Sequence, residues 1–534
     1  MADAPIGSRT LRPNFLVVMT DQERYPPPYE SESVARFRST LGAHERLRDG
    51  GVELHRHYAA STACVPSRTS LFTGHYPSLH GAAQTDGLAK SASDPRVSWL
   101  DPSTVPTMGD WFRAAGYRTE YRGKWHLSHA DLFATGTHDS LRTVDRRGVI
   151  DDAAVDAYRR TSRLEPWGFA GWIGREPHGA YLGDTGLVRD PLFAQQADEL
   201  FAGLRDEERP WLAVISLVNP HDIAFSTLQQ GFGFPEPSDA VPEIAPAPSQ
   251  EDPLDARPRV QTQFRDVWPR MLIPQPTDAA YRRFYYWLHA LADRAMTTVL
   301  DSLAAHGHDD DTVVVFTSDH GEMLGAHGGL QQKWYQAYEE SIHVPLVVRG
   351  PGIASLPEGI QVATSHIDVL PTLLGLAGID ETIAATVVGA DHVETHPLVG
   401  RDLSPLLRGE VTHDAVDAPV YFMTDDDISR GDRQLNIVTR EPYDAVAGPA
   451  RVESVIARIA SGPAGEPELW KLTRYFAEID DDSGCEWELH NLSRDPEERE
   501  DLATDPPREF DAMQAVLGLT RDRKRLTPRF TTQS

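Results

Sequence analysis

The sequence predicts an α/β protein: a large, mixed but mostly parallel sheet flanked by helices, followed by a smaller C-terminal α+β domain. Two patterns predict this fold class. Short, wholly apolar runs alternate with helical segments over most of the chain, and short alternating runs replace them after about residue 416. Runs that are apolar on both faces are typical of parallel strands covered by helices. The predicted domains are residues 1–415, with a proline-rich excursion, and residues 416–534.

Four apolar runs are predicted as central strands, and a weaker run is predicted as a fifth strand. A long helix is predicted over about residues 280–305, because Phe284, Trp287 and Leu291 recur at helical spacing. We interpret this stripe as core packing. The predicted strands are Asn14–Thr20, Trp211–Val218, Thr312–Thr317 and Val344–Val348, with Tyr117–Tyr121 as the weaker one.

Two later segments differ from this pattern. Residues 232–277 contain ten prolines, a density at which regular structure is not expected. They are predicted to form a long surface loop that could line a pocket or a subunit interface. In the C-terminal domain, alternating runs predict a small antiparallel sheet with a closing helix. These runs are Val420–Met423, Val452–Ile459 and Leu469–Phe476.

Composition limits the classes of partner. The formal charge of −29 argues against nucleic acid or an anionic membrane as a partner, so an anionic substrate would need a local cluster of positive groups. The two cysteines, Cys64 and Cys485, imply no disulfide framework. The first apolar run is too short for a signal-peptide core, and no stretch is long enough to cross a bilayer. We therefore expect a cytoplasmic protein.

Residues of catalytic type follow the predicted strands. Ligands bind at the carboxyl ends of strands in open α/β sheets. Acidic residues there are costly to desolvate unless they hold a metal or a counter-charge. A single Asp after a strand is more often a cap or turn residue, but independent capping does not account for several such ends. The residues at these ends are Asp21 and Gln22, Lys124 and His126, His221, and Asp319 and His320.

The segment Cys64-Val65-Pro66-Ser67-Arg68 has two interpretations when it is taken alone. It could begin a helix, with Pro66 in the first turn and Cys64 as a small buried thiol. The cysteine, the proline and the arginine also stand at a spacing that resembles the maturation signal of a known enzyme family. The rest of the chain decides between the two.

Taken in order, these motifs resemble those of type I sulfatases, which belong to the alkaline-phosphatase superfamily. The absence of a second Asp after the first strand, and His320 in place of an Asn, separate this chain from many arylsulfatases. It is more similar to the branch that holds choline sulfatases, phosphonate monoester hydrolases and related arylsulfatases. The matching elements are Asp-Gln, Cys-x-Pro-Ser-Arg, Gly-Lys-Trp-His, Pro-His, Ser-Asp-His-Gly-Glu, Lys333 with Tyr338–Leu346, and Trp487–Glu498.

The resemblance implies two cofactors. A formylglycine-generating enzyme would oxidise Cys64 to formylglycine, an aldehyde. One divalent metal ion would be held by Asp21, Asp319 and His320 with the modified Cys64, and Gln22 would lie at the edge of its coordination sphere. All-oxygen sites suit Ca²⁺, whereas an imidazole ligand shifts the preference toward Mn²⁺, and both ions are retained as candidates.

The resemblance also implies a mechanism. The metal and Arg68 would lower the pKa of a hydroxyl of the hydrated aldehyde, which attacks sulfur. Lys124 and Lys333 would stabilise the sulfuryl oxygens in the transition state. His221 would protonate the leaving alcohol, alone or with Lys333, and His126 would take the proton from the second hydroxyl so that sulfate leaves.

Three functions follow from these residues. The first is hydrolysis of a small or aromatic sulfate monoester, a sulfuric ester hydrolase activity. The second is hydrolysis of a phosphonate monoester or phosphodiester at the same site, which the motifs do not separate from the first. The third is a non-catalytic relative that binds an anion or a partner. The chain retains every charged group of the predicted site, which argues against this third function because a binding module needs fewer of them. A homodimer or homotetramer would fit the resemblance.

Other polar residues receive weaker interpretations. Five histidines are interpreted as structural or pocket-lining: His75, His80, His129, His327 and His343. A glycine-rich loop could shape the substrate pocket through Trp167, Trp172, Arg175, Glu176 and His178.

Overall fold

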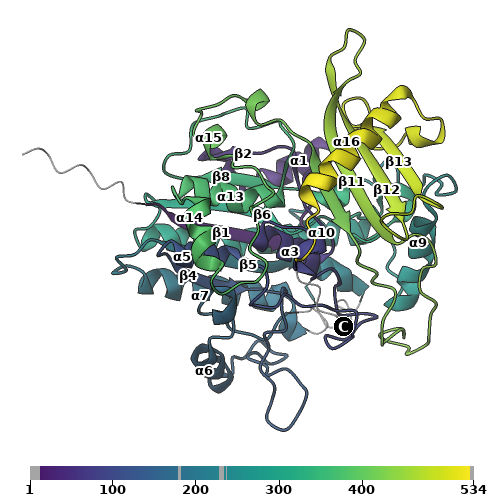
Figure 1. Ribbon diagram of the computed structural model, residues 1–534. Helices are drawn as coiled ribbons and strands as arrows, with labels where there is room; N and C mark the ends of the chain where they lie inside the picture. Colours follow the sequence, from purple (N-terminus) through teal and green to yellow (C-terminus); the bar gives the residue numbers. More distant parts are fainter. Residues whose placement is uncertain (1–11, 178–181, 228–233, 236, 530–534) are drawn as a thin grey trace, which may run out of the picture.

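The computed structural model describes residues 12–177, 182–227, 234–235 and 237–529. A six-stranded sheet in the order β2-β8-β6-β1-β5-β4 forms its centre (Figure 1). Strands β6, β1, β5 and β4 run parallel to one another, whereas β8 is antiparallel to β6 and β2 is antiparallel to β8. The sheet is thus mixed and mostly parallel, as predicted. The strands are β1 Asn14–Asp21, β2 Gly51–Glu53, β4 Arg118–Gly123, β5 Trp211–Pro220, β6 Thr312–Ser318 and β8 Leu346–Arg349.

The predicted strand Val344–Val348 was wrong as a single element. The chain divides at Pro345 into β7, His343–Val344, and β8. Proline lacks the N–H that a continuous ladder would need there. β7 instead joins a small three-stranded sheet with β3, His57–Tyr58, and β9, Thr364–Ser365.

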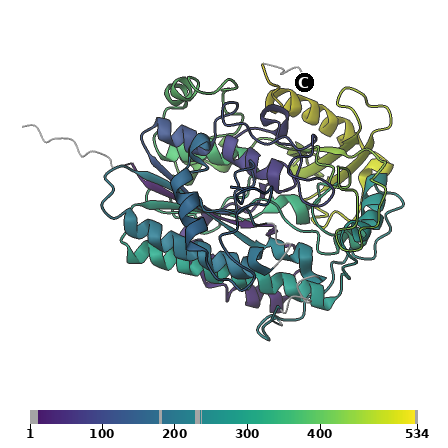
Figure 2. The same cartoon turned by 90° about the horizontal axis from the view of Figure 1, so that it is seen from below.

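Strand β1 explains why the central runs are apolar throughout. Its odd-numbered residues from Phe15 to Met19 pack into one hydrophobic core, and Leu16 and Val18 pack into another on the opposite face of the sheet. Helices cover both faces, as Figure 2 shows. The first core contains residues of α3 Cys64–Thr73, α5 Met108–Ala114, α13 His366–Leu376, α14 Glu381–Val388 and α15 Ser404–Leu407; the second contains residues of α2 Gly42–Asp49, α7 Gly186–Gly203 and α10 Ala279–Ala305.

The proline-rich excursion contains a helix that was not predicted, α9, Arg259–Met271. Seven of the ten prolines precede it, and only Pro269 lies within it, in its last turn. The buried side chains of Val260, Phe264 and Trp268 recur every four residues, so one face of α9 is anchored in the protein. Burial of this face outweighs the local effect of Pro269, and the prediction of irregular structure was wrong for this part.

The C-terminal part forms the predicted antiparallel sheet, in the order β10-β11-β12-β13. Helix α16, Arg508–Lys524, packs on it through Met513 and Leu517. The domain boundary at residues 415 and 416 stays a prediction. In the part of the chain that the structure describes, no single helix is long and apolar enough to cross a membrane, and only α13 with α14, bent by 106°, pass together. The strands are β10 Val420–Thr424, β11 Arg451–Ala460, β12 Pro467–Phe476 and β13 Glu486–Asn491; the remaining α-helices are α1 Glu32–Arg38, α4 Pro77–His80, α6 Asp152–Thr161, α11 Ala326–Gly329 and α12 Glu339–Ile342.

Candidate active site

The predicted site residues converge at one edge of the central sheet. Four adjacent parallel strands, β6, β1, β5 and β4, end there, and the segments that follow them carry the predicted carboxylates, imidazoles and Lys124. Cys64 is the first residue of helix α3, and Lys333 comes from the loop before α12. All ten are buried: Asp21, Gln22, Cys64, Arg68, Lys124, His126, His221, Asp319, His320 and Lys333.

Four of these residues form a cluster of metal-ligating type. Donor atoms of Asp21, Cys64, Asp319 and His320 lie within 4.8 Å of one another. The ring of His320 is oriented by Nδ1, which donates to the carbonyl of Gly321 at 3.0 Å and leaves the lone pair of Nε2 facing the cluster. Nε2 lies 3.1 Å from the sulfur of Cys64. Two carboxylates, an imidazole and position 64 therefore fit a divalent cation.

Arg68 joins the two carboxylates. Its Nε donates to Asp319 and its second terminal nitrogen donates to Asp21, both at 2.9 Å. Its remaining nitrogen donates to the carbonyl of Lys124 and to the hydroxyl of Ser216, also at 2.9 Å. One guanidinium thus connects the end of β1, the residue after β4, the middle of β5 and the segment after β6, and this pairing offsets the cost of burying the charges.

The charges around Cys64 oppose the effects of burial. Burial raises the pKa of Asp21, but Lys124, at 2.7 Å, and Arg68 outweigh it and hold that pKa well below its usual range. Burial and Asp21 raise the pKa of the Cys64 thiol, whereas Lys124 and Lys333 lower it, and the net shift is downward. The position of Cys64 at the start of α3 adds the partial positive charge of a helix N-terminus. Position 64 therefore favours a negatively charged oxygen or sulfur.

Gln22 contacts Lys333. Its side-chain oxygen accepts a hydrogen bond from the Lys333 ammonium at 2.8 Å, and its side-chain NH₂ donates to the carboxylate of Glu322. An ammonium on one side and a carboxylate on the other orient the amide. The backbone of Gln22 is left-handed, with φ 72°, and the hydroxyl of Tyr285 donates to its carbonyl at 2.7 Å. Metal ligation by Gln22 stays a prediction.

The segment after β4 can approach the site only because Gly123 lacks a side chain. Gly123 has φ +100°, and a Cβ there would lie 1.8 Å from the carbonyl oxygen of Ser216. Its own carbonyl accepts from Trp172 at 2.9 Å. The carboxylate of Glu176 accepts from the backbone N–H of Trp125 and His126, each at 3.1 Å. Burial raises the pKa of Glu176 to about 7.

The prediction that the loop from Trp167 to His178 shapes the pocket needs correction. Trp172 and Glu176 support the segment after β4 from behind. Trp167 donates to the carbonyl of Leu100, and Arg175 pairs with Asp184. None of these four residues lines the cavity described below, and His178 lies outside the described residues. The aromatic side chains are needed for packing, which a sequence does not distinguish from lining.

His126 pairs with a residue that the sequence analysis missed. Its Nε2 lies 2.9 Å from the carboxylate of Asp86. Burial lowers the pKa of His126, but the hydrogen bonds with Asp86 and Cys64 outweigh burial and raise it to about 9. Asp86 lies in a Thr-Asp-Gly stretch that is indistinguishable from an ordinary turn.

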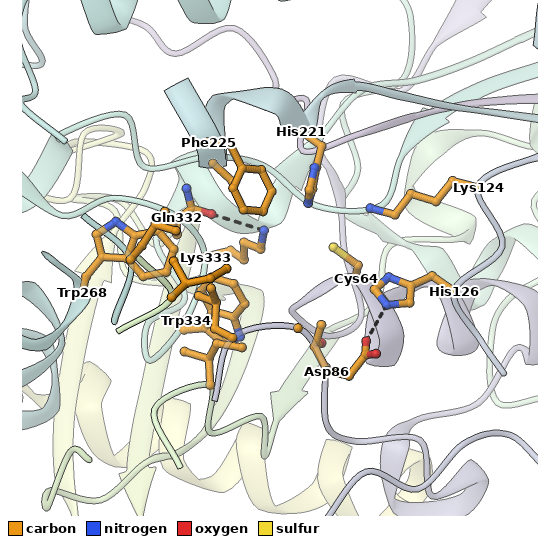
Figure 3. Close-up of a pocket in the computed structure, with 17 residues that line it drawn as sticks. Cys64, Asp86, Lys124, His126, His221, Phe225, Trp268, Gln332, Lys333 and Trp334 are labelled. Carbon is orange, nitrogen blue, oxygen red and sulfur yellow. Dashed lines mark hydrogen bonds and ion pairs between the residues drawn. The ribbon is translucent and has the colours of Figure 1, made fainter. Parts of the chain in front are cut away.

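A cavity of about 100 Å³ opens beside Cys64. Figure 3 shows Lys124, His126 and His221 on one side of it and Trp268, Trp334 and Phe225 on the other, with Lys333 between them. The five histidines interpreted as structural or pocket-lining do not line it. Its lining divides into a charged half around Cys64, with Asp86, Lys124, His126, His221 and Lys333, and an apolar wall of Phe225, Trp268, Leu272, Trp334, Ile428 and Ile437, beside which lies the polar side chain of Gln332.

Comparisons with known proteins agree with this geometry. The Sulfatase family matches residues 13–379. The chain is 25% identical to an uncharacterized sulfatase, YidJ, of Escherichia coli over 91% of its length and 92% of that protein. It is 27% identical to a choline-sulfatase of Rhizobium meliloti, with 69% and 68% of the two chains covered.

Two solved structures share the fold. One is of a putative sulfatase from Bacteroides thetaiotaomicron, with TM-score 0.65, 19% identity, and 96% and 93% of the two chains covered. The other is of a phosphonate monoester hydrolase from Silicibacter pomeroyi, with TM-score 0.60, 20% identity, and 97% and 96% covered.

Proposed function

The chain belongs to the sulfatase family and is a sulfuric ester hydrolase, and we propose that it cleaves a sulfate monoester with formylglycine at position 64 and one divalent metal ion. The observation that supports this most directly is the meeting of Cys64, two carboxylates, an imidazole and two lysines at one cavity. These groups come from three strand ends, a helix start and a loop, and so many buried charged groups beside one cavity are costly unless a metal or an anionic ligand uses them.

The residues around position 64 fit the two groups that the family implies. A hydrated aldehyde there would supply a nucleophilic hydroxyl, together with a second hydroxyl through which sulfate can be released. A divalent ion held by Asp21, Asp319 and His320 would supply positive charge beside the sulfuryl oxygens, and the imidazole favours Mn²⁺ over Ca²⁺. A formylglycine-generating enzyme would be the maturation partner.

The side chains of the chain itself bind and orient the ester. Lys124 and Lys333 lie on two sides of Cys64 and would hold sulfuryl oxygens (Figure 3). His221 lines the same cavity and would protonate the leaving alcohol, a role that needs its protonated form although burial, Lys124 and Lys333 hold its pKa well below its usual range. His126, held by Asp86, would accept the proton that is released when sulfate leaves, and it would do so in its neutral form, although the hydrogen bonds with Asp86 and Cys64 raise its pKa to about 9. Arg68 would keep Asp21 and Asp319 in place, because its guanidinium faces the carboxylates.

A phosphonate monoester is the second candidate substrate, because it also presents a tetrahedral anionic centre. The test compares kcat/KM for an aryl sulfate and for the matching aryl phosphonate monoester, with formylglycine at position 64 quantified by mass spectrometry in the same sample. We expect the sulfate to be preferred. A strong preference for the phosphonate would overturn the proposal in favour of the second candidate.

Two controls distinguish a protein that lacks formylglycine at position 64 from one that cannot hydrolyse the ester. The Cys485→Ala variant should retain full activity, because Cys485 lies in the C-terminal part and does not line the cavity. An unmodified thiol at position 64 in protein from the native host, together with no hydrolysis, would favour a non-catalytic relative.

A further inference from the structure

We propose that the apolar wall is the subsite for the alcohol portion of the ester, that it takes an uncharged aromatic alcohol, and that Asp426 holds it in shape from the C-terminal sheet. This inference rests on the proposed sulfate ester hydrolysis. The alcohol leaves from the sulfur atom that faces Cys64, so it must occupy the part of the cavity beyond the charged half. That part is the apolar wall.

Segments far apart in the chain build the wall. Phe225 follows β5, and Trp268 and Leu272 come from α9 and the residue after it. Ile428 and Ile437 come from the long connection between β10 and β11. Aromatic and branched aliphatic side chains around an open cavity leave apolar surface exposed to water. A bound apolar ring would bury this surface, which favours binding.

The orientation of Trp334 shows which property it offers to a ligand. Its indole N–H donates to Asp426 at 3.0 Å and is therefore already satisfied. Its ring lies near that of Trp268, with centroids 5.9 Å apart and planes inclined by 32°. The two tryptophans thus present apolar ring surface to the cavity, as offset or tilted aromatic pairs do.

The same tryptophan argues against a cationic alcohol. The Lys333 ammonium lies 4.6 Å from the centre of the Trp334 ring, where a bound cation would seek its contact. A quaternary ammonium group would meet like charge there. The acidic lining residue Asp86 pairs with His126 at the opposite side of the cavity.

A carbohydrate is also disfavoured on this wall. Most sugar hydroxyl groups would lose hydrogen bonds with water without gaining partners from Phe225, Leu272 or Ile437, since among the described residues the open donors on this side are the side-chain NH₂ of Gln332 and the indole N–H of Trp268. A second sulfate or a carboxylate on the sugar would be desolvated against the same surface. An aromatic alcohol with a single sulfate group meets neither cost.

Asp426 connects the wall to the charged half. It is buried and follows strand β10. One carboxylate oxygen accepts from the backbone N–H of Thr85 at 3.0 Å and from Lys90 at 3.1 Å, and the other accepts from Trp334. Thr85 immediately precedes Asp86, the partner of His126. Asp426 is thus a positioning residue for both sides of the cavity.

The first test uses enzyme in which formylglycine has been quantified and a panel of four esters: methyl sulfate, 2-naphthyl sulfate, choline sulfate and glucosamine 6-sulfate. We expect KM for 2-naphthyl sulfate, which depends less than kcat/KM on how readily the alcohol leaves, to lie roughly tenfold or more below KM for glucosamine 6-sulfate and choline sulfate. A preference for either of the latter would overturn the inference while leaving sulfate hydrolysis intact. Absence of turnover of all four by modified enzyme would overturn the proposed function itself.

The second test assigns the preference to the wall. Trp268→Ala should raise KM for 2-naphthyl sulfate roughly tenfold and change kcat/KM for methyl sulfate less than twofold. Trp268→Phe should restore most of the loss. The matched control is Trp487→Ala in strand β13, which should leave the ratio of the two substrates unchanged. An unchanged ratio in Trp268→Ala would overturn the inference.

The third test concerns Asp426. The variant Asp426→Asn keeps the size of the side chain but removes the charge that Lys90 and Trp334 face. We expect KM for 2-naphthyl sulfate to rise several-fold more than KM for methyl sulfate. Equal changes in both, or none in either, would show that Asp426 does not position the wall.

Discussion

The two halves of the cavity are built on opposite principles. The charged half is made of residues at the ends of adjacent parallel strands and at the start of α3, joined by hydrogen bonds of Arg68 and Lys124. The apolar wall is assembled from a loop, a helix and the connection between two C-terminal strands, and it presents ring and aliphatic surface to the cavity, not charge. One half therefore depends on directional contacts and the other on shape.

This difference separates reaction from selectivity. Charge that develops on sulfuryl oxygens needs groups at defined distances, whatever alcohol is bound. Contact with an apolar alcohol needs only surface of the right form, which different side chains can supply. Loss of position 64 or of a metal-ligating carboxylate should therefore affect all esters alike, loss of the proton donor should affect esters according to how readily the alcohol leaves, and substitutions in the wall should change the order of esters according to the shape of the alcohol.

The largest effect is expected from loss of position 64 or of a metal-ligating carboxylate. Cys64→Ala and Asp319→Asn should each reduce kcat by roughly a thousandfold or more, equally for methyl and 2-naphthyl sulfate. Circular dichroism should show that the fold is retained. A loss confined to one of the two esters would contradict the separation of reaction from selectivity. Normal activity in either variant would contradict the assignment of Cys64 and Asp319 to the active site.

His221→Ala should give the next largest effect, and one that depends on the leaving group. A poor leaving group needs a proton in the transition state, so alkyl sulfates should lose roughly a hundredfold or more in kcat/KM. 4-Nitrophenyl sulfate, whose alcohol leaves readily, should lose little. A uniform loss across a leaving-group series would count against His221 as the general acid.

Gln22→Met should have a moderate effect and decides between two roles of Gln22. The change removes the oxygen that accepts from Lys333 but keeps the length of the side chain. If Gln22 orients Lys333, kcat should fall by roughly tenfold while metal content, measured by mass spectrometry, stays unchanged. Loss of metal from the variant would instead support the ligation predicted from the sequence.

The smallest effect on turnover, but a clear one on stability, is expected at His44. Burial lowers the pKa of His44, whereas Glu23 and Asp293, at 2.9 and 2.7 Å, outweigh burial and raise it to about 9. Protonated His44 therefore contributes about 3 kcal/mol to the free energy of unfolding. This contribution is fully present below pH 6.5 and is lost as the pH rises through about 9.

Denaturant unfolding between pH 6 and 10 would measure this dependence. His44→Gln should flatten the dependence of the free energy of unfolding on pH, whereas His138→Gln, at an exposed position, should not. A wild-type protein whose stability does not fall over this range would contradict the prediction.

Most of the strands, the long helix and most of the charged half could be predicted, because residue patterns within short segments of the chain indicate them. Strand β1 is apolar throughout and ends in Asp21, and β6 is followed by Asp319 and His320. Parallel strands in one sheet bring such ends to one edge, so their meeting follows from the fold class. The break at Pro345 was missed although the sequence shows this proline, which lacks the N–H that a continuous strand needs. Helix α9 was missed because a tertiary contact, the burial of one of its faces, decided it.

The sequence by itself determined the fold class, the family and the residues able to carry out the reaction, because that chemistry restricts residue type and spacing. Only the tertiary structure decided that Asp86 pairs with His126, that Asp426 reaches Trp334, and that Ile437 faces the cavity. Ordinary turns and apolar residues occur throughout a chain of 534 residues. Which of them meet is set by how distant segments pack, and hydrophobic contact, being non-directional, leaves no local pattern to find.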